Sequence, residues 1–305
     1  VFYLTRVPSP AIIAQAFKDV KPAIVIAVPL VIEKIIRKKV FPQIQNTKVK
    51  LLMKMPGVGK KVKKRICEQV YQAFGGNLYE VIIGGAALNQ EIESFLKDID
   101  FPFTVGYGAT ECAPIITYSD WHDFVPMSCG REVVHMEVKI DSENPETVPG
   151  EILARGLNVM LGYYKNDEAT AQTIDEDGWY HTGDLGLMDK GGNVFIKGRS
   201  KNMLLGPNGQ NIYPEEIEDK LNSMTFAMES VVVQRDGKLV GLVHPDFDEV
   251  QAMGLSRDDL QSLMEENRVQ VNANLPVYCK IAAIEIHDEE FEKTPKKSIK
   301  RYLYK

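Results

Sequence analysis

The stretch YEVIIGGAALNQEIESFLKDIDFPFTVGYGATE, residues 79–111, decides the fold class of this chain. Its apolar run 79–83 predicts a buried strand that ends in the turn Gly84-Gly85-Ala86-Ala87. Asn89 is a typical cap for the helix that follows, and residues 103–105 predict a second short strand. Strands that alternate with helices indicate a parallel sheet, whose ligand sites lie at the carboxyl ends of the strands. Both glycine-bearing turns of this stretch lie at such ends.

The α/β pattern extends upstream of this stretch and changes downstream of it. Upstream, residues 12–17 suit a helix, residues 24–28 a buried strand and residues 62–74 a second helix. Residues 128–197 contain short alternating strands with Gly, Pro and Asp-Gly turns, which predicts a small β-subdomain. The region 198–305 predicts an α+β domain. We therefore expect three parts, with boundaries after residues 127 and 197.

Turns and caps predict individual elements within these parts. Pro214 stands in the first turn of a predicted helix, and Ser256 begins another helix in which Asp259 completes a capping box. The predicted strands cover residues 133–140, 150–155, 193–196, 230–234 and 239–243.

The composition is that of an ordinary globular protein, with 305 residues of which 44% are hydrophobic and 26% charged. It excludes a disordered chain, a collagen and a disulfide-rich miniprotein. The four cysteines form no Cys-x-x-Cys pair, so we expect reduced thiols and a cytoplasmic protein. The longest uncharged apolar run, 23–32, is about half as long as a membrane-spanning helix. The first residues include no initiator Met and no signal sequence, so we expect the chain to begin inside a longer protein.

Charge is distributed unevenly along the chain. The 36 basic and 42 acidic residues leave a net charge of −6, yet the segment from Lys34 to Cys67 contains twelve Lys and Arg and no Asp or Glu. Such a basic segment fits an anionic membrane surface, which predicts peripheral membrane contact, or an anionic cofactor. The alternative is a solvated helix face with Val62, Ile66 and Val70 on its buried side. We expect no nucleic-acid partner.

Three further segments carry side chains that suit catalysis or binding. Tyr107-Gly108-Ala109-Thr110-Glu111 offers a flat ring for stacking, a hydroxyl and a carboxylate that suits a divalent cation. In Thr182-Gly183-Asp184, a carboxylate at a glycine turn can accept two hydrogen bonds from a vicinal diol such as a ribose. The alternative there is an Asp-capped turn between strands. In Gly198-Arg199-Ser200-Lys201, the guanidinium of Arg199 can contact phosphate or ribose oxygens.

In this order and spacing, these segments and the Gly84-Gly85-Ala86 turn resemble the adenylate-forming acyl-CoA synthetase superfamily. Residues 149–165 and GRSKNMLLGPNGQNIYPEEIE, residues 198–218, are most similar to long-chain fatty acid CoA ligases. The resemblance covers nearly the whole chain. It implies that residues 1–127 are the C-terminal part of a large α/β domain to which the β-subdomain 128–197 also belongs. It also implies that residues 198–305 form a mobile domain.

The resemblance implies a two-step reaction. A fatty acid carboxylate attacks the α-phosphate of ATP, which is bound with Mg²⁺, to give an acyl-adenylate and pyrophosphate. The thiol of coenzyme A then displaces AMP to give the thioester. Two other functions stay open at this point. One is an acyl or aryl adenylation enzyme that delivers its product to a carrier protein, and the other is a non-catalytic nucleotide-binding or interaction module.

The same resemblance implies roles for residues of the first part. Tyr107 and the adjacent Gly108 would bind adenine, with the tyrosine ring stacked on the base. Thr110 would contact phosphate, and Glu111 would hold Mg²⁺. The turn Gly84-Gly85-Ala86 would line the adenine and acyl pocket.

In the later parts, Asp184 would bind both ribose hydroxyls, and Arg199 would bind the ribose and phosphate. Lys201 would be the hinge about which the C-terminal domain rotates between the two half-reactions. Gly209 would face the coenzyme A channel.

The sequence departs from the family pattern in two places. The family's phosphate-binding loop, a Ser/Thr/Gly-rich stretch that ends in Pro-Lys, does not occur in residues 1–305. We therefore expect little or no ligase activity from this chain alone. The family's C-terminal lysine, which reaches the α-phosphate and the acyl carboxylate, is replaced by Ser298. Lys297 and Lys300 are the candidates to take its place, and the alternative for this cluster is a solvated basic tail.

Overall fold

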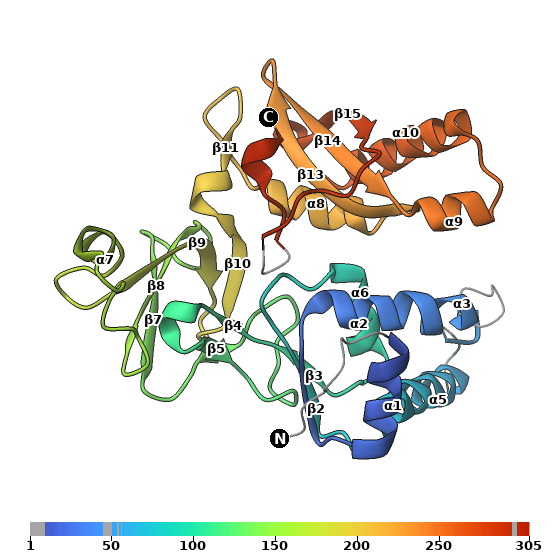
Figure 1. Cartoon of the computed structure of the whole chain (residues 1–305), viewed down its shortest axis with the longest axis horizontal. Helices are drawn as coiled ribbons and strands as arrows, with labels where there is room; N and C mark the ends of the chain where they lie inside the picture. The colour runs from blue at the N-terminus through green and yellow to red at the C-terminus, as the bar shows by residue number, and fades with distance from the viewer. Residues whose placement is uncertain (1–9, 45–50, 54, 56, 295–297, 305) are drawn as a thin grey trace. The chain divides into compact units, whose positions relative to one another are not determined.

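The structure is a computed structural model of the chain (Figure 1), and it describes residues 10–44, 51–53, 55, 57–294 and 298–304. Both helices and strands occur throughout, which confirms the predicted mixture of α/β and α+β structure. The chain forms two compact units, of which the first comprises Val1–Glu137, Gly156–Leu161 and Lys190–Val194, and the second Val138–Arg155, Gly162–Asp189 and Phe195–Lys305. The three-part division at residues 127 and 197 stays a prediction.

A three-stranded parallel sheet forms the centre of the first unit. Its strands are β1 (Ile24–Ala27), β2 (Glu80–Ile83) and β3 (Phe103–Val105), paired in the order β1-β2-β3. A π-helical turn, Ile36–Val40, separates α2 from α3. The helices are α1 (Pro10–Val20), α2 (Pro29–Ile35), α3 (Phe41–Ile44), α5 (Val58–Ala73) and α6 (Gln90–Asp98).

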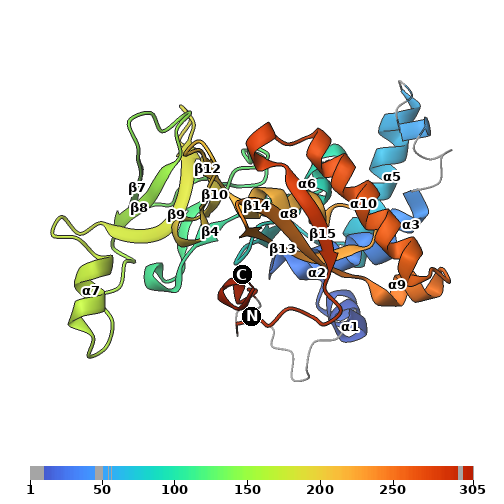
Figure 2. The same ribbon diagram turned by 90° about the horizontal axis from the view of Figure 1, so that it is seen from above.

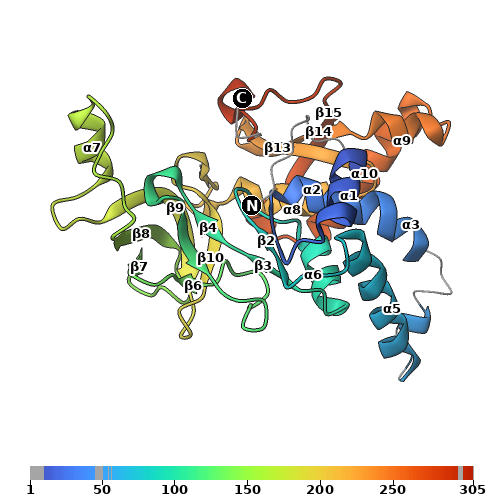
Figure 3. The ribbon, with the colours of Figure 1, turned by 60° about the horizontal axis from the view of Figure 1, so that its bottom comes forward.

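The helices next to this sheet follow from amphipathic sequence and from caps. Ile66 and Val70 are the buried side of α5, which begins four residues before the predicted helix 62–74. The side chain of Asn89 accepts hydrogen bonds from two backbone N–H groups in the first turn of α6, so the predicted cap is confirmed. The rings of Phe17 and Phe74 stack at 5.1 Å and join α1 to the end of α5. Figure 3 shows the ribbons of these two helices.

A second, antiparallel sheet follows β3 directly. It consists of β4 (Tyr107–Gly108), β5 (Ile115–Tyr118) and β6 (Arg131–Glu132), and the short 3₁₀ helix Thr110–Cys112 connects the first two strands. The first two residues of the Tyr-Gly-x-Thr-Glu segment are therefore held by pairing with β5, and its last two lie in the 3₁₀ helix.

A four-stranded sheet contains most of the predicted β-subdomain. Its strands are paired in the order β10-β9-β8-β7, with the bounds β7 (Met136–Asp141), β8 (Gly150–Gly156), β9 (Tyr180–Met188) and β10 (Val194–Arg199). The helix α7 (Asp167–Thr173) lies between β8 and β9 in the chain. The predicted strand 133–140 starts late, at Met136, because the backbone N–H of Met136 bonds to the carbonyl of Val133 and closes a turn there.

The last part of the second unit is an α+β structure (Figure 2). Its sheet has the order β13-β14-β15, with β13 antiparallel and β15 parallel to β14. The predicted capping box of Ser256 and Asp259 begins α10, and Pro214 occupies the first turn of α8. The elements are β11 (Leu204–Leu205), β12 (Asn211–Ile212), α8 (Pro214–Asn222), β13 (Ala227–Arg235), β14 (Lys238–Pro245), α9 (Phe247–Ala252), α10 (Arg257–Ala273) and β15 (Ile281–Ile286), with 3₁₀ turns at Ser200–Asn202, Val277–Cys279 and Arg301–Leu303.

The two faces of this sheet are covered differently. Helices α8 and α10 cover one face, where Leu221 and Met264 are fully buried. The other face is covered by the chain after β15, through Phe291, Ile299 and Tyr304. Among the described residues, no helix is long and apolar enough to cross a membrane.

Replacing Leu221 with alanine tests the packing of α8 on this sheet. Because Leu221 is fully buried, Leu221→Ala should lower the free energy of unfolding by about 2–5 kcal/mol. Val269→Ala, at a position of α10 that is 56% exposed, is the matched control and should change it by about 0.5 kcal/mol or less. Urea unfolding followed by circular dichroism measures both, and equal effects would contradict the packing described here.

Candidate functional site

The two glycine turns of the first unit lie next to each other at the carboxyl ends of β2 and β3. The N–H of Gly84 donates to the carbonyl of Ala27 at 3.1 Å, and the N–H of Gly106 donates to the carbonyl of Ile83 at 2.9 Å. A Cβ on Gly84 would stand 3.2 Å from the carbonyl oxygen of Gly106, so the backbones are in close contact. Gly85 and Ala86 are exposed beside them. The structure thus brings the predicted turn together with the start of the Tyr-Gly-x-Thr-Glu segment.

Strand β4 and the turn after it hold the residues of this segment in different environments. Tyr107 is buried, whereas Thr110 is exposed and Glu111 is half-buried in the 3₁₀ helix. A Cβ on Gly108 would lie 2.0 Å from the carbonyl oxygen of Pro114, so no side chain fits there. The hydroxyl and the carboxylate that were predicted to meet phosphate and metal therefore both lie in one tight turn.

Asn158 holds that turn in place and was not identified from the sequence. Its side-chain N–H₂ donates to the carbonyls of Cys112 at 2.7 Å and Ile115 at 2.8 Å. The backbone N–H of Met160 donates to the carbonyl of Glu111 at 2.7 Å. An asparagine that satisfies two carbonyls far away in the chain leaves no local pattern in the sequence, because both partners are more than forty residues away.

In the second unit, Thr182-Gly183-Asp184 lies inside strand β9 and not in a turn between strands. Glu151 of β8 pairs with Leu185 of β9, and Leu153 pairs with His181. An advance of two residues along β8 therefore corresponds to four residues along β9. The extra residues form a bulge, and Gly183 has the left-handed φ of +69° that such a bulge favours in glycine. The predicted glycine turn is therefore corrected to a β-bulge.

Asp184 and Arg199, which the sequence assigned to one ribose, form an ion pair. The Nε of Arg199 lies 2.8 Å from Oδ1 of Asp184. The side chain of Asp184 is only 12% exposed, while that of Arg199 is 54% exposed. Burial of a carboxylate is costly unless it is paired, and Arg199 supplies that pairing while its outer face stays accessible.

The predicted hinge and coenzyme A residues lie on exposed backbone. Lys201 is exposed in the 3₁₀ turn that follows β10, and Gly209 is exposed in the loop between β11 and β12. Two contacts tie the hinge region to α8: Asn202 donates to Glu215 at 2.7 Å, and Lys197 pairs with Glu216 at 2.7 Å.

The C-terminal segment holds one of the two candidate lysines in an ion pair. The Nζ of Lys300 lies 3.1 Å from Glu292, and this hydrogen bond raises the pKa of Lys300. Lys297 lies outside the described residues. The carbonyl of Ser298 accepts a hydrogen bond from the N–H of Thr294 at 2.8 Å.

Arg301, next to Lys300, anchors this segment on α8. Its guanidinium donates to the carboxylate of Glu218. Burial raises the pKa of Glu218 to about 7, and the charge of Arg301 opposes that rise.

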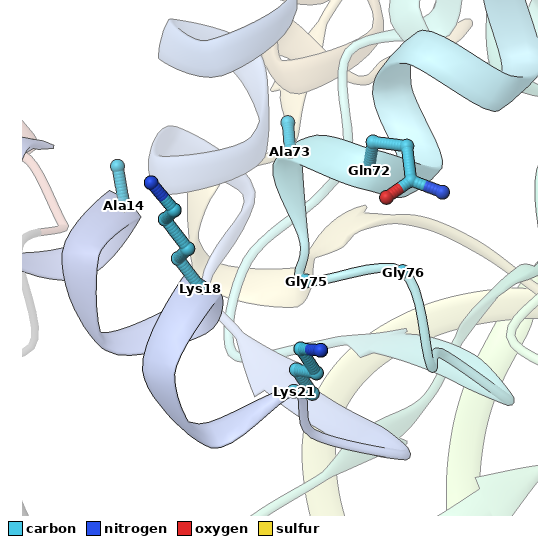
Figure 4. Close-up of a pocket in the computed structure, with 7 residues that line it drawn as sticks. All are labelled: Ala14, Lys18, Lys21, Gln72, Ala73, Gly75 and Gly76. Atoms are coloured by element: carbon cyan, nitrogen blue, oxygen red, sulfur yellow. The ribbon is translucent and has the colours of Figure 1, made fainter.

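A surface pocket of about 430 Å³ lies elsewhere in the first unit, between α1 and the end of α5 (Figure 4). Lys18, Lys21 and Gln72 line it, and none of the predicted site residues does. We do not assign it to the site. Over the described parts of the chain, no cluster of three or more His, Cys, Asp or Glu side chains could hold a metal ion.

Residues 1–164 match the model of a protein family described as AMP-binding enzyme. The chain belongs to the AMP-binding enzyme family. The long-chain-fatty-acid–CoA ligase ACSBG2 of Rattus norvegicus is 30% identical over 251 residues, which is 75% of this chain and 36% of the rat protein. The long-chain-fatty-acid–CoA ligase 1 of Saccharomyces cerevisiae is 30% identical over 217 residues, 68% of this chain and 31% of the yeast protein.

Solved structures share this fold of the AMP-binding enzyme family. The o-succinylbenzoate coenzyme A synthetase MenE of Bacillus subtilis in complex with AMP has a TM-score of 0.70 at 19% identity, over 97% of this chain and 53% of MenE. MenE with ATP and magnesium ion has a TM-score of 0.66 at 19% identity, over 96% of this chain and 54% of MenE. The chain thus spans about a third of the length of the curated relatives and about half of MenE.

Replacing Asn158 tests how the Tyr-Gly-x-Thr-Glu turn is held. Asn158→Ala should lower the free energy of unfolding by about 2 kcal/mol, because two carbonyls lose their donor. Asn158→Asp should cost about as much, since a carboxylate cannot donate. Asn144→Ala, at an exposed position, is the control. Thermal and urea unfolding provide the measurement, and a loss no larger than that of the control would refute this role.

Proposed function

We propose that this chain is part of an acyl-CoA ligase that activates a long-chain fatty acid through an acyl-adenylate. Membership of the AMP-binding enzyme family supports the adenylate chemistry. The names of the rat and yeast relatives support a long-chain fatty acid as the substrate. The observation that carries the proposal is the buried Asp184 carboxylate, paired with the exposed Arg199. The sequence resemblance implies ribose binding by both residues.

The proposed nucleoside contacts follow from what each side chain offers. A carboxylate has about four acceptor positions, so the 2′ and 3′ hydroxyls of ribose can donate to Asp184 beside the guanidinium of Arg199. Charge-assisted bonds of this kind contribute about 1.5–3 kcal/mol each. Arg199 also contacts phosphate, and Tyr107 stacks on adenine next to Gly108. The turn Gly84-Gly85-Ala86 lines the adenine and acyl pocket.

The residues present fit a Mg²⁺ ion that is bound together with the phosphates of ATP. Magnesium in proteins is usually held by one or two carboxylates together with substrate phosphates and water. Glu111 supplies one half-buried carboxylate, and Thr110 exposes a hydroxyl for phosphate in the same turn. Bound there, Mg²⁺ neutralises charge on the phosphates.

The thioester step uses coenzyme A and the C-terminal region. We propose that Lys201 is the hinge about which residues 198–305 rotate between the half-reactions, and that Gly209 faces coenzyme A. Lys300 is the candidate for the lysine that Ser298 replaces, and it would have to leave Glu292 to reach a substrate. Lys297 is the other candidate.

The ribose contact is tested by Asp184→Asn. Adenosine binding by this variant should be about tenfold weaker than in the parent chain, because the charge of the acceptor is lost. Asp236→Asn, in the exposed turn between β13 and β14, should bind adenosine normally. Isothermal titration calorimetry measures both affinities, and equal affinity of the two variants would remove Asp184 from the site.

We also propose peripheral membrane contact through the basic segment between Lys34 and Cys67. On α5, Lys60, Lys61 and Lys64 are exposed, and next to the start of this helix Leu51 is 65% exposed. The first turn of a helix disfavours positive charge because of the helix dipole, so an anionic surface would relieve Lys60 and Lys61. Basic and apolar groups side by side suit the headgroup region of a bilayer.

Vesicle binding tests this contact. Changing Lys60, Lys61 and Lys64 together to glutamine should weaken binding to phosphatidylserine-containing vesicles about a hundredfold, at about 1 kcal/mol per charge. Glutamine at the exposed positions Lys165, Lys190 and Lys238 is the matched control. Binding should also fall as salt is added. If the parent chain does not sediment with these vesicles at low salt, the membrane proposal is wrong.

A further inference from the structure

We propose that Glu151 is a positioning residue that, together with His181, sets the place of the Asp184 carboxylate. The inference rests on the proposed function, in which Asp184 binds the ribose. Glu151 lies on β8, and Asp184 and His181 lie on the neighbouring strand β9. Glu151 lies in the stretch 149–165 that carries the resemblance, but no role was assigned to it from the sequence. We propose that it acts through the backbone of β9 without touching substrate.

One carboxylate holds the β9 bulge at two points. Oε1 of Glu151 accepts a hydrogen bond from the backbone N–H of Gly183 at 2.8 Å. Oε2 of Glu151 lies 3.0 Å from Nδ1 of His181. Bulged residues lose their regular strand partners, so the Gly183 N–H takes a side chain of the facing strand as its acceptor.

Thr182, which precedes Gly183 in the bulge, is also held. The hydroxyl of Thr182 donates to the carbonyl of Ile152 at 2.7 Å and accepts the backbone N–H of Asp184 at 3.0 Å. Glu151 thus holds the N–H of Gly183, and Thr182, itself bound to Ile152, holds the N–H of Asp184. Since Gly183 has a left-handed φ and no side chain, its peptide is free to rotate unless its N–H is bound. Releasing Glu151 would therefore move the carboxylate that receives the ribose.

His181, which contacts Glu151, also lies near a second carboxylate, that of Asp175. Its Nε2 lies 3.6 Å from Oδ2 of Asp175, in the turn before β9. Oδ1 of Asp175 accepts the backbone N–H of Trp179 at 2.8 Å, which keeps the turn closed. The cations nearby, Lys139 of β7 and Arg155 of β8, lie over the ring of Trp179.

With both ring nitrogens protonated, His181 donates toward both carboxylates. The hydrogen bond to Glu151 is the main reason that the pKa of His181 is raised above its ordinary value near 6.5. A raised pKa means that the charged pairing is complete below about pH 6.5. It is lost as the pH rises through the pKa of the folded protein. Ribose recognition should therefore weaken at alkaline pH.

The test compares adenosine with 2′,3′-dideoxyadenosine, which lacks both hydroxyls proposed to meet Asp184. Neither probe carries a phosphate that titrates in this range. In Glu151→Ala, adenosine affinity should fall about tenfold, whereas dideoxyadenosine affinity should not change. Glu146→Ala, at an exposed position between β7 and β8, should retain the preference of the parent chain for adenosine. A variant that had merely become less stable would lose affinity for both nucleosides.

Two further variants separate the hydrogen bond from Gly183 to Glu151 from the charge of His181. Glu151→Gln keeps an acceptor for the Gly183 N–H, so the preference for adenosine should be largely restored. His181→Gln should remove the dependence of that preference on pH between 6 and 9. The inference is overturned if Glu151→Ala prefers adenosine as strongly as the parent chain does.

A failure of the proposed function would look different. The parent chain would then show no preference for adenosine over dideoxyadenosine. Positioning would still be measured by nuclear magnetic resonance, through amide exchange of Gly183 and the carboxyl carbon shift of Asp184. Glu151→Ala should speed the exchange and move the shift, and Glu146→Ala should do neither. If Glu151→Ala leaves both signals unchanged, Glu151 does not position Asp184.

Discussion

A carboxylate withdrawn from water has to be paired, and the surroundings of Asp184 in the second unit satisfy this constraint. Arg199 pairs with the carboxylate directly, at the end of the strand next to β9. Thr182 and Glu151 bind the backbone on which Asp184 stands. The bulge in β9 makes the Glu151 contact possible. It takes the N–H of Gly183 out of regular strand pairing, and Glu151 accepts this N–H. Because these contacts already hold the carboxylate of Asp184 in one orientation, little conformational entropy is lost there when a ligand binds.

In the first unit the corresponding constraint is close approach of backbone. Parallel pairing of β2 and β3 places the turns after both strands at one edge of the sheet. At that edge Gly84 and Gly106 are in contact, and a few residues later Gly108 packs against Pro114. At this edge Gly85 and Gly108 are exposed, whereas Gly106 is buried, and the hydroxyl of Thr110 and the carboxylate of Glu111 lie in the following turn. Such a surface suits a flat base and a charged phosphate, which side chains would otherwise keep at a distance.

The C-terminal sheet shows how a short segment can complete a core. Helices α8 and α10 cover only one face, and the other is covered by the segment that carries Lys300 and Arg301. The half-buried pair of Arg301 and Glu218 joins this segment to α8, and Glu215 of α8 also binds Asn202 beside the hinge. The lysine segment and the proposed hinge are therefore connected through one helix.

Local sequence by itself determined the elements whose signals lie within a few residues of each other. The Asn89 cap, the Ser256 capping box and the glycine turns after β2 and β3 are of this kind, and the family motifs placed Asp184 and Arg199 among the candidates. Tertiary structure decided the rest: the bulge at Gly183, the ion pair of Asp184 with Arg199, and the contacts of Asn158 and Glu151. The physical reason is that these interactions join residues from fifteen to forty-six positions apart, where no short-range pattern specifies a partner. Strand pairing in the sheet β10-β9-β8-β7 brings Asp184 to Arg199 and Glu151 to Gly183. Packing of the turn after β8 brings Asn158 to the carbonyls of Cys112 and Ile115.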